Sequence, residues 1–413
     1  MELYVREKYL KKIRGFYHDA ELIKVITGVR RCGKSCLMET IRDELLANGV
    51  DGKDIIYLDL DKKKYRKIKT DDQLEALIEE QMDPNEEKKG LKYLFVDEIQ
   101  NVNNFEELMN AYREDGELSI FITGSNSYLL SGELATKLTG RYVEFELFPL
   151  SFDEYLEMKE FYGKPLQENL QIELNNYLQE GGFPKAVQYD TLADKRTYVV
   201  SVIHEIFEKD IKKRAKVRNT EAFTAARNFV INNFGATFSI AGMQKEMEKT
   251  GLRIKRATLN RYMDILLKSK ILYECNRFDM KSKRSMQGEK KYYLADTSFY
   301  FALNTDNRIN YGPALENMVY VYARSMDYSV SVGRIGKLEC DFILRDTELN
   351  YSYVQVAYTI NESKKTEDRE YAPLESISDN YPKYVATTDF LLQKRNGIKH
   401  INILDFIKSK SRF

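Results

Sequence analysis

Residues 26–35 read Ile-Thr-Gly-Val-Arg-Arg-Cys-Gly-Lys-Ser, and this stretch decides the fold. From Gly28 to Ser35 it matches G-x-x-x-x-G-K-[ST], the pattern of a phosphate-binding loop. An apolar segment precedes the loop at residues 22–27, and apolar residues at helical spacing follow it from residue 36. A loop that joins a strand to a helix N-terminus points its backbone N–H groups at phosphate oxygens. The stretch therefore predicts a nucleotide site in an α/β domain.

The residue types within the loop indicate how ATP and Mg²⁺ would be bound. The Lys34 ammonium is expected to reach the β- and γ-phosphates, and the Ser35 hydroxyl is expected to ligate Mg²⁺. A glycine-rich turn without a ligand is the alternative. The residues expected to contact the nucleotide in and beside the loop are Gly28, Arg31, Cys32, Gly33, Lys34, Ser35 and Cys36.

A second strand with chemistry at its end covers residues 93–96 and closes on Asp97-Glu98. Two carboxylates after an apolar strand, downstream of a phosphate-binding loop, are typical of the Walker B arrangement. Asp97 is expected to hold Mg²⁺ through water, and Glu98 to orient and deprotonate the attacking water. Acids at a strand end are common, so this prediction depends on the loop that precedes them.

Two further catalytic candidates lie beside predicted strands, one directly after the fourth strand and one directly before the fifth. Residues 118–123 form a strand that leads into Gly124-Ser125-Asn126, where Asn126 or Ser125 is expected to sense the γ-phosphate. A polar turn is the alternative. Arg141 precedes a strand at residues 142–147 and is a candidate arginine finger, acting in cis or on a neighbouring copy. A surface arginine is the alternative there.

Alternating strands and helices over residues 1–150 predict a doubly wound parallel sheet, with the ligand at the carboxyl ends of the strands. The amphipathic segment at residues 1–20 packs either into the core alone or also over adenine. Residues 151–215 are expected to form a helical lid, opened by a capping box of Ser151 and Glu154. Within it, Gly-Gly-Phe-Pro at residues 181–184 either sets Pro184 against adenine or is a turn between helices.

Residues 216–290 predict three short helices followed by a β-hairpin, which is the order of a winged helix. Between residues 201 and 300 there are 21 Lys and Arg against 11 Asp and Glu, in a chain of zero net charge. A local surplus of basic residues favours duplex or branched DNA as the partner, although winged helices also bind proteins. The candidate DNA contacts on the third helix and the hairpin are Lys255, Arg256, Arg261, Lys283 and Arg284.

Residues 291–413 return to mixed α/β patterns that suggest a restriction-endonuclease-like domain. Glu316 on a helix, Asp341 on a strand and Gln355 on the next strand follow the order of metal ligands in such nucleases. The lysine expected two positions after Gln355 is replaced by Ala357. We therefore expect a vestigial, inactive site, with an active Mg²⁺-dependent nuclease as the alternative.

The composition sets the cellular context. No apolar run is long enough for a membrane span, and residues 1–6 do not begin a signal peptide. The four cysteines show no metal-type pairing, so free thiols in a reducing compartment are expected. We therefore expect a cytoplasmic protein that is not bound to membranes.

The sequence resembles the bacterial and archaeal AAA+ (STAND-related) ATPases that end in a winged helix and a restriction-endonuclease-like domain. The phosphate-binding loop, the strand ending in Asp97-Glu98, the segments at residues 123–125, 138–141 and 181–184, and residues 338–343 carry the resemblance. The resemblance implies ATP hydrolysis, homo-oligomeric rings or partial rings, and association with DNA. We expect an ATPase that couples hydrolysis to DNA binding or remodelling. The rivals are a signalling switch with a protein-binding winged helix and an ATPase-regulated nuclease.

Overall fold

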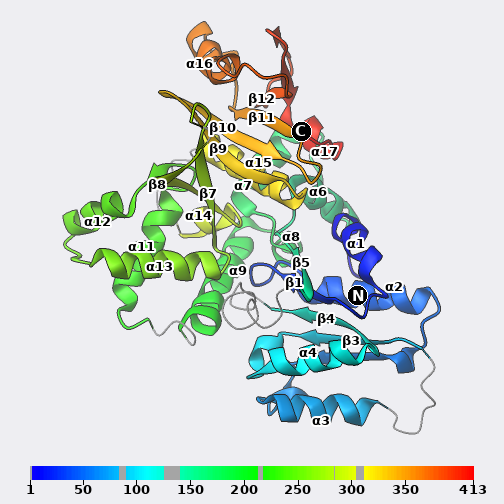
Figure 1. Ribbon diagram of the computed structural model, residues 1–413. Coiled ribbons are helices and arrows are strands. Elements are labelled where there is room, and N and C mark those ends of the chain that lie inside the picture. The colour runs from blue at the N-terminus through cyan, green and yellow to red at the C-terminus, as the bar shows by residue number, and fades with distance from the viewer. Residues whose placement is uncertain (1, 83–89, 125–139, 213–216, 283, 304–310) are drawn as a thin grey trace. The chain divides into compact units, whose positions relative to one another are not determined.

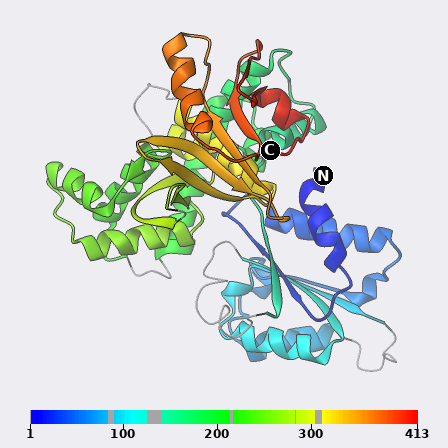
Figure 2. The ribbon, with the colours of Figure 1, turned by 45° about the horizontal axis from the view of Figure 1, so that its top comes forward.

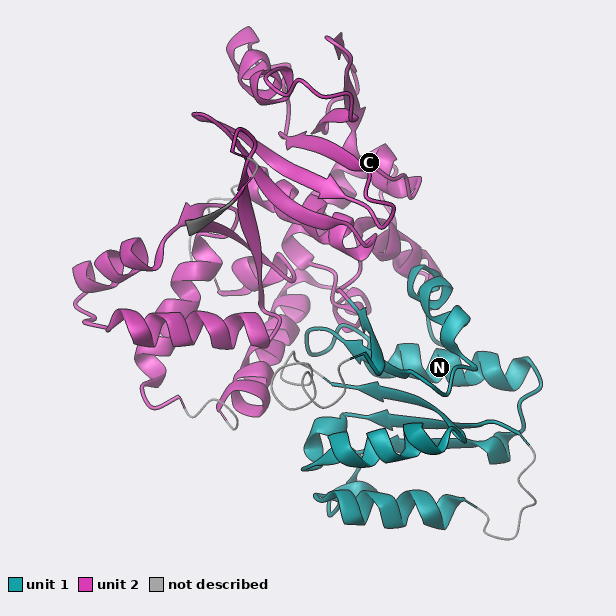
Figure 3. Cartoon of the chain, in the orientation of Figure 1, with its two compact units in different colours: residues 1–147 teal, residues 148–413 magenta. Residues whose placement is uncertain are grey.

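The structure is a computed structural model that describes residues 2–82, 90–124, 140–212, 217–282, 284–303 and 311–413 (Figure 1). It consists of two compact units, residues 1–147 and residues 148–413 (Figure 3). The boundary between the units lies three residues before the predicted end of the nucleotide domain at residue 150. None of the described helices is both long and apolar enough to cross a membrane.

Unit 1 is built on a five-stranded sheet in the order β2-β3-β4-β1-β5, and every neighbouring pair is parallel. Its strands are β1 (Ile23–Thr27), β2 (Ile55–Asp59), β3 (Lys92–Asp97), β4 (Leu118–Thr123) and β5 (Tyr142–Glu146). These strands confirm the predicted parallel α/β architecture. The described helices of unit 1 longer than a single turn are α1 (Glu7–Ile13), α2 (Lys34–Ala47), α3 (Asp71–Gln81) and α4 (Phe105–Asp115). Helix α2 covers one face of the sheet, and α3 and α4 cover the other (Figures 1 and 2).

The core of unit 1 follows from the alternation of side chains along buried strands. Every second residue of β1, β2, β3 and β4 faces α3 and α4, and these apolar side chains form one continuous cluster. The helices contribute Leu74 and Ile78 from α3 and Phe105 and Met109 from α4. Because both faces of the sheet are covered, β1 and β4 are buried along their whole length, as parallel strands with helices on both sides require.

Unit 2 begins with the helices predicted for residues 151–215. The capping box of Ser151 and Glu154 is present at the start of the first helix. These elements are α6 (Phe152–Phe161), α7 (Leu170–Glu180), α8 (Pro184–Val187), α9 (Leu192–Glu205) and a π-helical segment at Ile206–Lys212. Three further helices follow in the region predicted to hold the winged helix and its hairpin, namely α11 (Thr220–Asn232), α12 (Ile240–Lys249) and α13 (Arg256–Lys268).

A nine-stranded sheet runs through the rest of unit 2 in the order β13-β14-β12-β11-β10-β9-β7-β8-β6. Its strands are β6 (Thr237–Phe238), β7 (Leu272–Asp279), β8 (Arg284–Leu294), β9 (Ser329–Ile335), β10 (Leu338–Arg345), β11 (Tyr351–Val356), β12 (Lys383–Thr387), β13 (Lys394–Arg395) and β14 (Ile398–Asn402). Helices α14 (Ser298–Leu303), α15 (Tyr311–Ser325), α16 (Lys364–Glu375) and α17 (Ile403–Lys408) accompany it. The predicted domain boundary at residue 290 falls inside β8, so the hairpin and the C-terminal strands share one sheet.

The Gly181-Gly182 turn between α7 and α8 is packed within unit 2. Gly181 has φ +78°, and a Cβ added there would lie 1.9 Å from Asp296 Oδ1. The Gly182 N–H donates to Asp296 Oδ2 at 2.6 Å, and the Leu150 N–H donates to the Gly182 carbonyl at 2.7 Å. The turn therefore joins α7 and α8 to the segment before α14, which gives both glycines a structural reason.

Replacing Gly181 with alanine tests this packing. We expect Gly181→Ala to lower the free energy of unfolding by about 3 kcal/mol or more, because it adds backbone strain to an overlap with Asp296. Gly163→Ala is the matched control, since Gly163 also has a positive φ but no atom within 4 Å of its added Cβ. That control should cost only about 1 kcal/mol. Equal losses in urea unfolding followed by circular dichroism would contradict the packing argument.

Candidate functional site

The phosphate-binding loop connects β1 to α2 and has the close backbone packing that its glycines predict. Gly28 has φ +144°, and a Cβ added there would lie 2.1 Å from the Leu147 carbonyl oxygen and 2.9 Å from Cys32 Sγ. The Leu147 N–H donates to the Thr27 carbonyl at 2.8 Å, which holds the segment after β5 against the start of the loop. Any residue other than glycine at position 28 would push these segments apart.

The loop presents the side chains that a nucleotide and Mg²⁺ require. Lys34, the first residue of α2, is buried, and its Nζ donates to the carbonyls of Gly28 at 3.1 Å and Val29 at 3.2 Å. Ser35 and Cys36 follow in the first helical turn and are exposed, as is Arg31 in the loop. An ammonium inside the loop, a hydroxyl in the first turn and a helix N-terminus fit a triphosphate with its cation.

An arginine outside the motif also contacts the loop. Arg6 is buried, and its Nη1 donates to the Cys32 carbonyl at 3.2 Å, while its guanidinium carbon lies 4.5 Å from the centre of the Tyr9 ring. Cys32 itself is buried, and burial raises the pKa of its thiol. Arg6 therefore holds the loop from the N-terminal segment, a role that no local pattern in the sequence predicted.

The ends of β3 and β4 bring the acidic pair together with a threonine. The Thr123 hydroxyl donates to Asp97 Oδ1, and the same hydroxyl oxygen accepts the Glu98 N–H at 3.1 Å. Thr123 is fully buried, and Asp97 is 2% exposed. Thr123 thus orients both acidic residues. The sequence analysis predicted a polar γ-phosphate sensor after this strand, but at Asn126 or Ser125. Both of these residues lie outside the described residues.

Glu98 is held in a specific, buried environment. Its backbone is left-handed, with φ 56°, which turns the chain away from β3 directly after Asp97. Gln100 Nε2 donates to Glu98 Oε2, and Arg30 Nη2 lies 3.9 Å from the same oxygen. Burial raises the pKa of the Glu98 carboxyl, although Lys34 and Arg30 oppose the shift. A buried carboxylate with a raised pKa beside a phosphate-binding loop suits a general base.

Arg141 lies at the opposite end of the strands from the loop. It immediately precedes β5, and its carbonyl accepts the Ile23 N–H at the start of β1, whereas the phosphate-binding loop follows the end of β1. Its Nη1 donates to Asn110 Oδ1 at 3.1 Å and lies 3.7 Å from Glu114 Oε1. This position favours a role at a second copy over a role at the loop of the same chain. Action on a second copy stays a prediction.

The other predicted residues lie in unit 2. Pro184 is the first residue of α8, and its contact with adenine stays a prediction. Lys255 caps α13, Arg256 begins it and Arg261 follows one turn later, all three exposed. Arg284, also exposed, begins β8, and Lys283 lies outside the described residues.

The predicted vestigial nuclease residues are linked through their neighbours. Lys291 bridges Glu316 and Asp341, and Gln355 Oε1 accepts the Asp341 N–H at 3.3 Å. No group of three or more His, Cys, Asp or Glu among the described residues is arranged to hold a metal ion. The predicted order of elements is present, and the vestigial character of this site stays a prediction.

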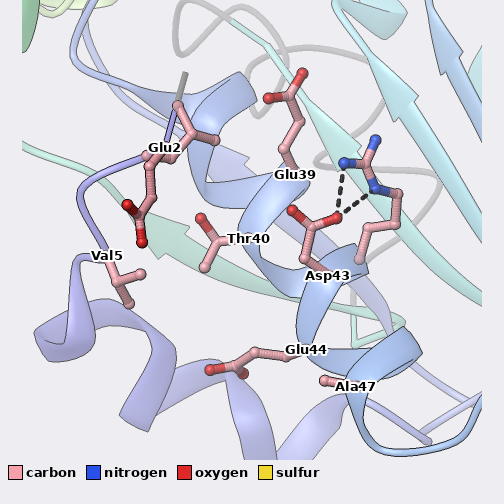
Figure 4. A pocket seen from close by; sticks show the side chains of 9 residues that line it. Glu2, Val5, Glu39, Thr40, Asp43, Glu44 and Ala47 are labelled. Atoms are coloured by element: carbon pink, nitrogen blue, oxygen red, sulfur yellow. Dashed lines mark hydrogen bonds and ion pairs between the residues drawn. The ribbon is translucent and has the colours of Figure 1, made fainter.

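A separate hollow of about 510 Å³ lies between the N-terminal segment and the outer side of α2 (Figure 4). Four of its nine lining residues are acidic, Glu2, Glu39, Asp43 and Glu44, and Asp43 accepts hydrogen bonds from Arg42. Four carboxylates against the single guanidinium of Arg42 give the lining a net negative charge that repels phosphate, so we do not assign the nucleotide to this hollow.

Comparisons with known proteins agree with the geometry of unit 1. A family described as an AAA domain matches residues 20–156, and a family described only as a domain of unknown function matches residues 171–309. The second match crosses both boundaries, at 215 and 290, that the sequence predicted within unit 2. A Walker-type ATPase of Pyrococcus abyssi superposes with a TM-score of 0.50 at 15% identity, over 73% of this chain and 96% of its own. At that identity it shows the fold alone.

Two relatives match most of the chain. An uncharacterized protein of Haemophilus influenzae is 34% identical over 404 residues, which cover 97% of this chain and 98% of the relative. An uncharacterized protein of Methanocaldococcus jannaschii is 30% identical over 370 residues, which cover 86% of this chain and 80% of the relative. Both matches therefore extend beyond unit 1 into the sequence of unit 2.

The link between β3 and β4 gives a prediction for the site. Thr123→Val removes the hydroxyl that serves Asp97 and the Glu98 N–H, and we expect a loss of about 1–3 kcal/mol in the free energy of unfolding. Thr123→Ser keeps the hydroxyl and should lose about 1 kcal/mol or less, for one buried methyl group. Thermal unfolding by circular dichroism measures both. A valine variant as stable as the serine variant would show that the hydrogen bonds of this hydroxyl do not contribute to stability.

Proposed function

We propose that this chain, which belongs to the family of these bacterial and archaeal relatives and matches an AAA domain over residues 20–156, hydrolyses ATP and couples hydrolysis to DNA binding or remodelling. The observation that carries the ATPase part is the convergence of Lys34 with Asp97 and Glu98 at one edge of a parallel sheet. Glu98 is buried between the loop residue Arg30 and Gln100. In this proposal Glu98 is the base that takes the proton of the attacking water.

The residues around the loop divide the remaining tasks. The loop N–H groups and Lys34 would bind the phosphates of ATP, with Arg31, Cys32 and Cys36 beside them, while Ser35 and Asp97 would hold Mg²⁺. Bound Mg²⁺ would supply positive charge at the β- and γ-phosphate oxygens. Lys34 now bonds loop carbonyls, so binding requires its ammonium to turn from Gly28 and Val29 to phosphate. Asn126 as a γ-phosphate sensor and Pro184 beside adenine complete the proposed set.

Arg141 extends the proposal to a homo-oligomer. Arg141 lies at the amino end of β5, away from the loop of its own chain, which supports a role at the nucleotide of a second copy. Its exposed side chain lies beside Glu114, also exposed, and a pair of this kind costs little to break. An arginine finger supplied in trans stabilises charge that develops on the transferred phosphoryl group.

Glu98→Gln tests the assignment of the base. We expect this variant to bind ATP as the wild type does and to lose ATP turnover by about 100-fold or more, because the amide cannot accept the proton of water. Nucleotide binding is measured with a fluorescent ATP analogue and turnover by phosphate release. Lys34→Ala is the contrasting variant and should lose binding itself. A Glu98→Gln enzyme that turns over at the wild-type rate would remove Glu98 from the mechanism.

The DNA part of the proposal is supported by the arrangement of α11, α12 and α13 with the β7–β8 hairpin. Helix α13 buries Leu259, Met263 and Leu266 and exposes Lys255, Arg256 and Arg261 near its N-terminus. Strand β6 pairs with β8 beside the hairpin, as in a winged helix. Exposed cations on the third helix and at the hairpin can neutralise phosphates of duplex or branched DNA.

A charge-matched comparison tests DNA binding. Replacing Lys255, Arg256 and Arg261 together with alanine should weaken duplex binding and reduce the log–log salt slope by about 1 for each lost phosphate contact. The control replaces three exposed lysines elsewhere in unit 2, Lys364, Lys365 and Lys394, and should keep the wild-type slope. Fluorescence anisotropy between about 50 and 200 mM salt measures both. Equal losses in the two variants, or no wild-type binding at low salt, would contradict the proposal.

A further inference from the structure

The strongest cluster of charge outside the nucleotide site lies where β8, β10 and α15 meet in unit 2. Lys291 on β8 is 5% exposed, and its Nζ lies 2.8 Å from Glu316 Oε1 and 2.9 Å from Glu339 Oε1. Asp341 Oδ1 lies 3.8 Å from the same Nζ. Three carboxylates from one helix and one strand therefore surround a single ammonium group. We refer to Lys291, Glu316, Glu339 and Asp341 as the lysine cluster.

Other groups of the protein also donate hydrogen bonds to the carboxylates of the cluster. The Tyr293 hydroxyl donates to Glu316 Oε1, Arg277 Nη2 lies 2.8 Å from Glu339 Oε2, and the Val356 N–H donates to Asp341 Oδ2 at 2.9 Å. These donors come from β7, β8 and the end of β11. Each carboxylate is thus hydrogen-bonded by the protein itself, which is what a buried acid requires in the absence of a metal.

Gln355 is also turned away from a ligand role. Its Oε1 accepts the Asp341 N–H at 3.3 Å, and its Nε2 donates to Glu370 Oε2 at 2.9 Å. The oxygen that would coordinate a metal is therefore taken by the backbone. Together with the absence of any described three-residue metal group, this shows that Glu316, Asp341 and Gln355 do not fit the cation that a restriction-type nuclease would hold.

The electrostatics agree with an ammonium as the resident cation. Burial lowers the pKa of Lys291, but the opposing charges of Glu316, Asp341 and Glu339 outweigh burial, and the net shift is upward. Burial, followed by the nearby Glu316, raises the pKa of Asp341 well above its usual range. The three carboxylates therefore favour the charged form of the Lys291 ammonium, whereas burial disfavours the charged form of Asp341.

We infer that Lys291 stands where a divalent cation would be bound, so that the lysine cluster is a metal-independent joint between the β7–β8 hairpin, β10 and α15. Lys291 reaches this position because β8 runs past the hairpin into the shared sheet, where it pairs with Cys275 of β7 and Thr237 of β6. The ammonium thus fixes the hairpin to the C-terminal strands. This inference does not depend on ATP hydrolysis.

The first test measures divalent cations on the full wild-type chain without nucleotide. We expect the midpoint of thermal unfolding to agree within about 1 °C in EDTA and in millimolar Mn²⁺, because a cation that does not bind cannot stabilise the chain. Electron paramagnetic resonance of Mn²⁺ counts any bound ion directly. Mn²⁺ binding that disappears in Asp341→Asn would overturn the inference, and this comparison does not require a Lys291 variant to fold.

The second test removes the ammonium. We expect Lys291→Met in EDTA to unfold roughly 10 °C below the wild type, because one buried and two partly buried carboxylates lose their common partner. Mn²⁺ should then restore part of the loss, and Lys291→Met combined with Asp341→Asn should not respond to Mn²⁺. Lys290→Met is the matched control on the same strand, since Lys290 makes one half-exposed pair with Glu274 at 2.6 Å. It should shift the midpoint by only about 2 °C.

A folded Lys291→Met variant that ignores Mn²⁺ would contradict the inference, because the three carboxylates would then not form a cation site even without the ammonium. A loss in Lys290→Met as large as that in Lys291→Met would contradict it as well. Cleavage of linear DNA by the wild type with Mg²⁺ or Mn²⁺, abolished by Asp341→Asn, would show a working metal site in place of a lysine joint.

Discussion

The parallel register of β1, β3 and β4 is the constraint on which the chemistry of unit 1 depends. Backbone pairing sets Ile26 opposite Thr123 and Val96 opposite Ile122, so the loop, the acidic pair and Thr123 all leave the sheet at one edge. The Thr123 hydroxyl then completes the link between β3 and β4 by bonding Asp97 and the Glu98 N–H. A slip of one residue would turn each of these side chains to the opposite face.

Buried charged groups in unit 2 are paired with other groups of the same unit. Lys159 and Glu173 form a buried pair at 2.8 Å, and the Asp296 carboxylate accepts the Gly182 N–H. Burial raises the pKa of Asp296 to about 6, although its hydrogen bonds oppose that shift. The lysine cluster follows the same rule with more members. Removing one partner from such a set leaves the other charges without a partner and shielded from water, which is strongly destabilising. These sites therefore fix the arrangement of elements more firmly than exposed pairs do.

Much of unit 1 could be predicted from local patterns, because its signals are short and continuous. Apolar runs ending in Thr27, Asp97 and Thr123 locate the buried strands, and the loop pattern fixes what lies between β1 and α2. The long-range contacts could not be predicted. Arg6 reaches the loop across 26 residues, and no local pattern indicates that contact. The place of Arg141 at the amino end of β5, by contrast, follows from its position before a strand of a parallel sheet.

In unit 2, even more of the long-range contacts could not be predicted from local sequence patterns. The sequence predicted the order of its helices and strands, yet it separated the hairpin from the C-terminal strands at residue 290, inside β8. Ala357 stands at the position where a lysine is expected in a restriction-type nuclease. No local pattern could show that Lys291, more than 60 positions earlier, supplies an ammonium to the same carboxylates. Burial of Lys291 and its partners is a property of the folded sheet, and a single basic residue in a strand carries no sign of it.

The shared sheet also constrains how ATP could act on DNA. Strand β8 begins at Arg284, one of the proposed DNA contacts, and continues to Lys291 and Leu294 in the body of the sheet. Because the lysine cluster binds this strand to β10 and α15, a hinge between the hairpin and the C-terminal strands would have to break a buried set of charges. Such a break costs several kcal/mol. Under the proposed function, any movement driven by nucleotide is therefore expected to carry the β7–β8 hairpin, β10 and α15 as one piece.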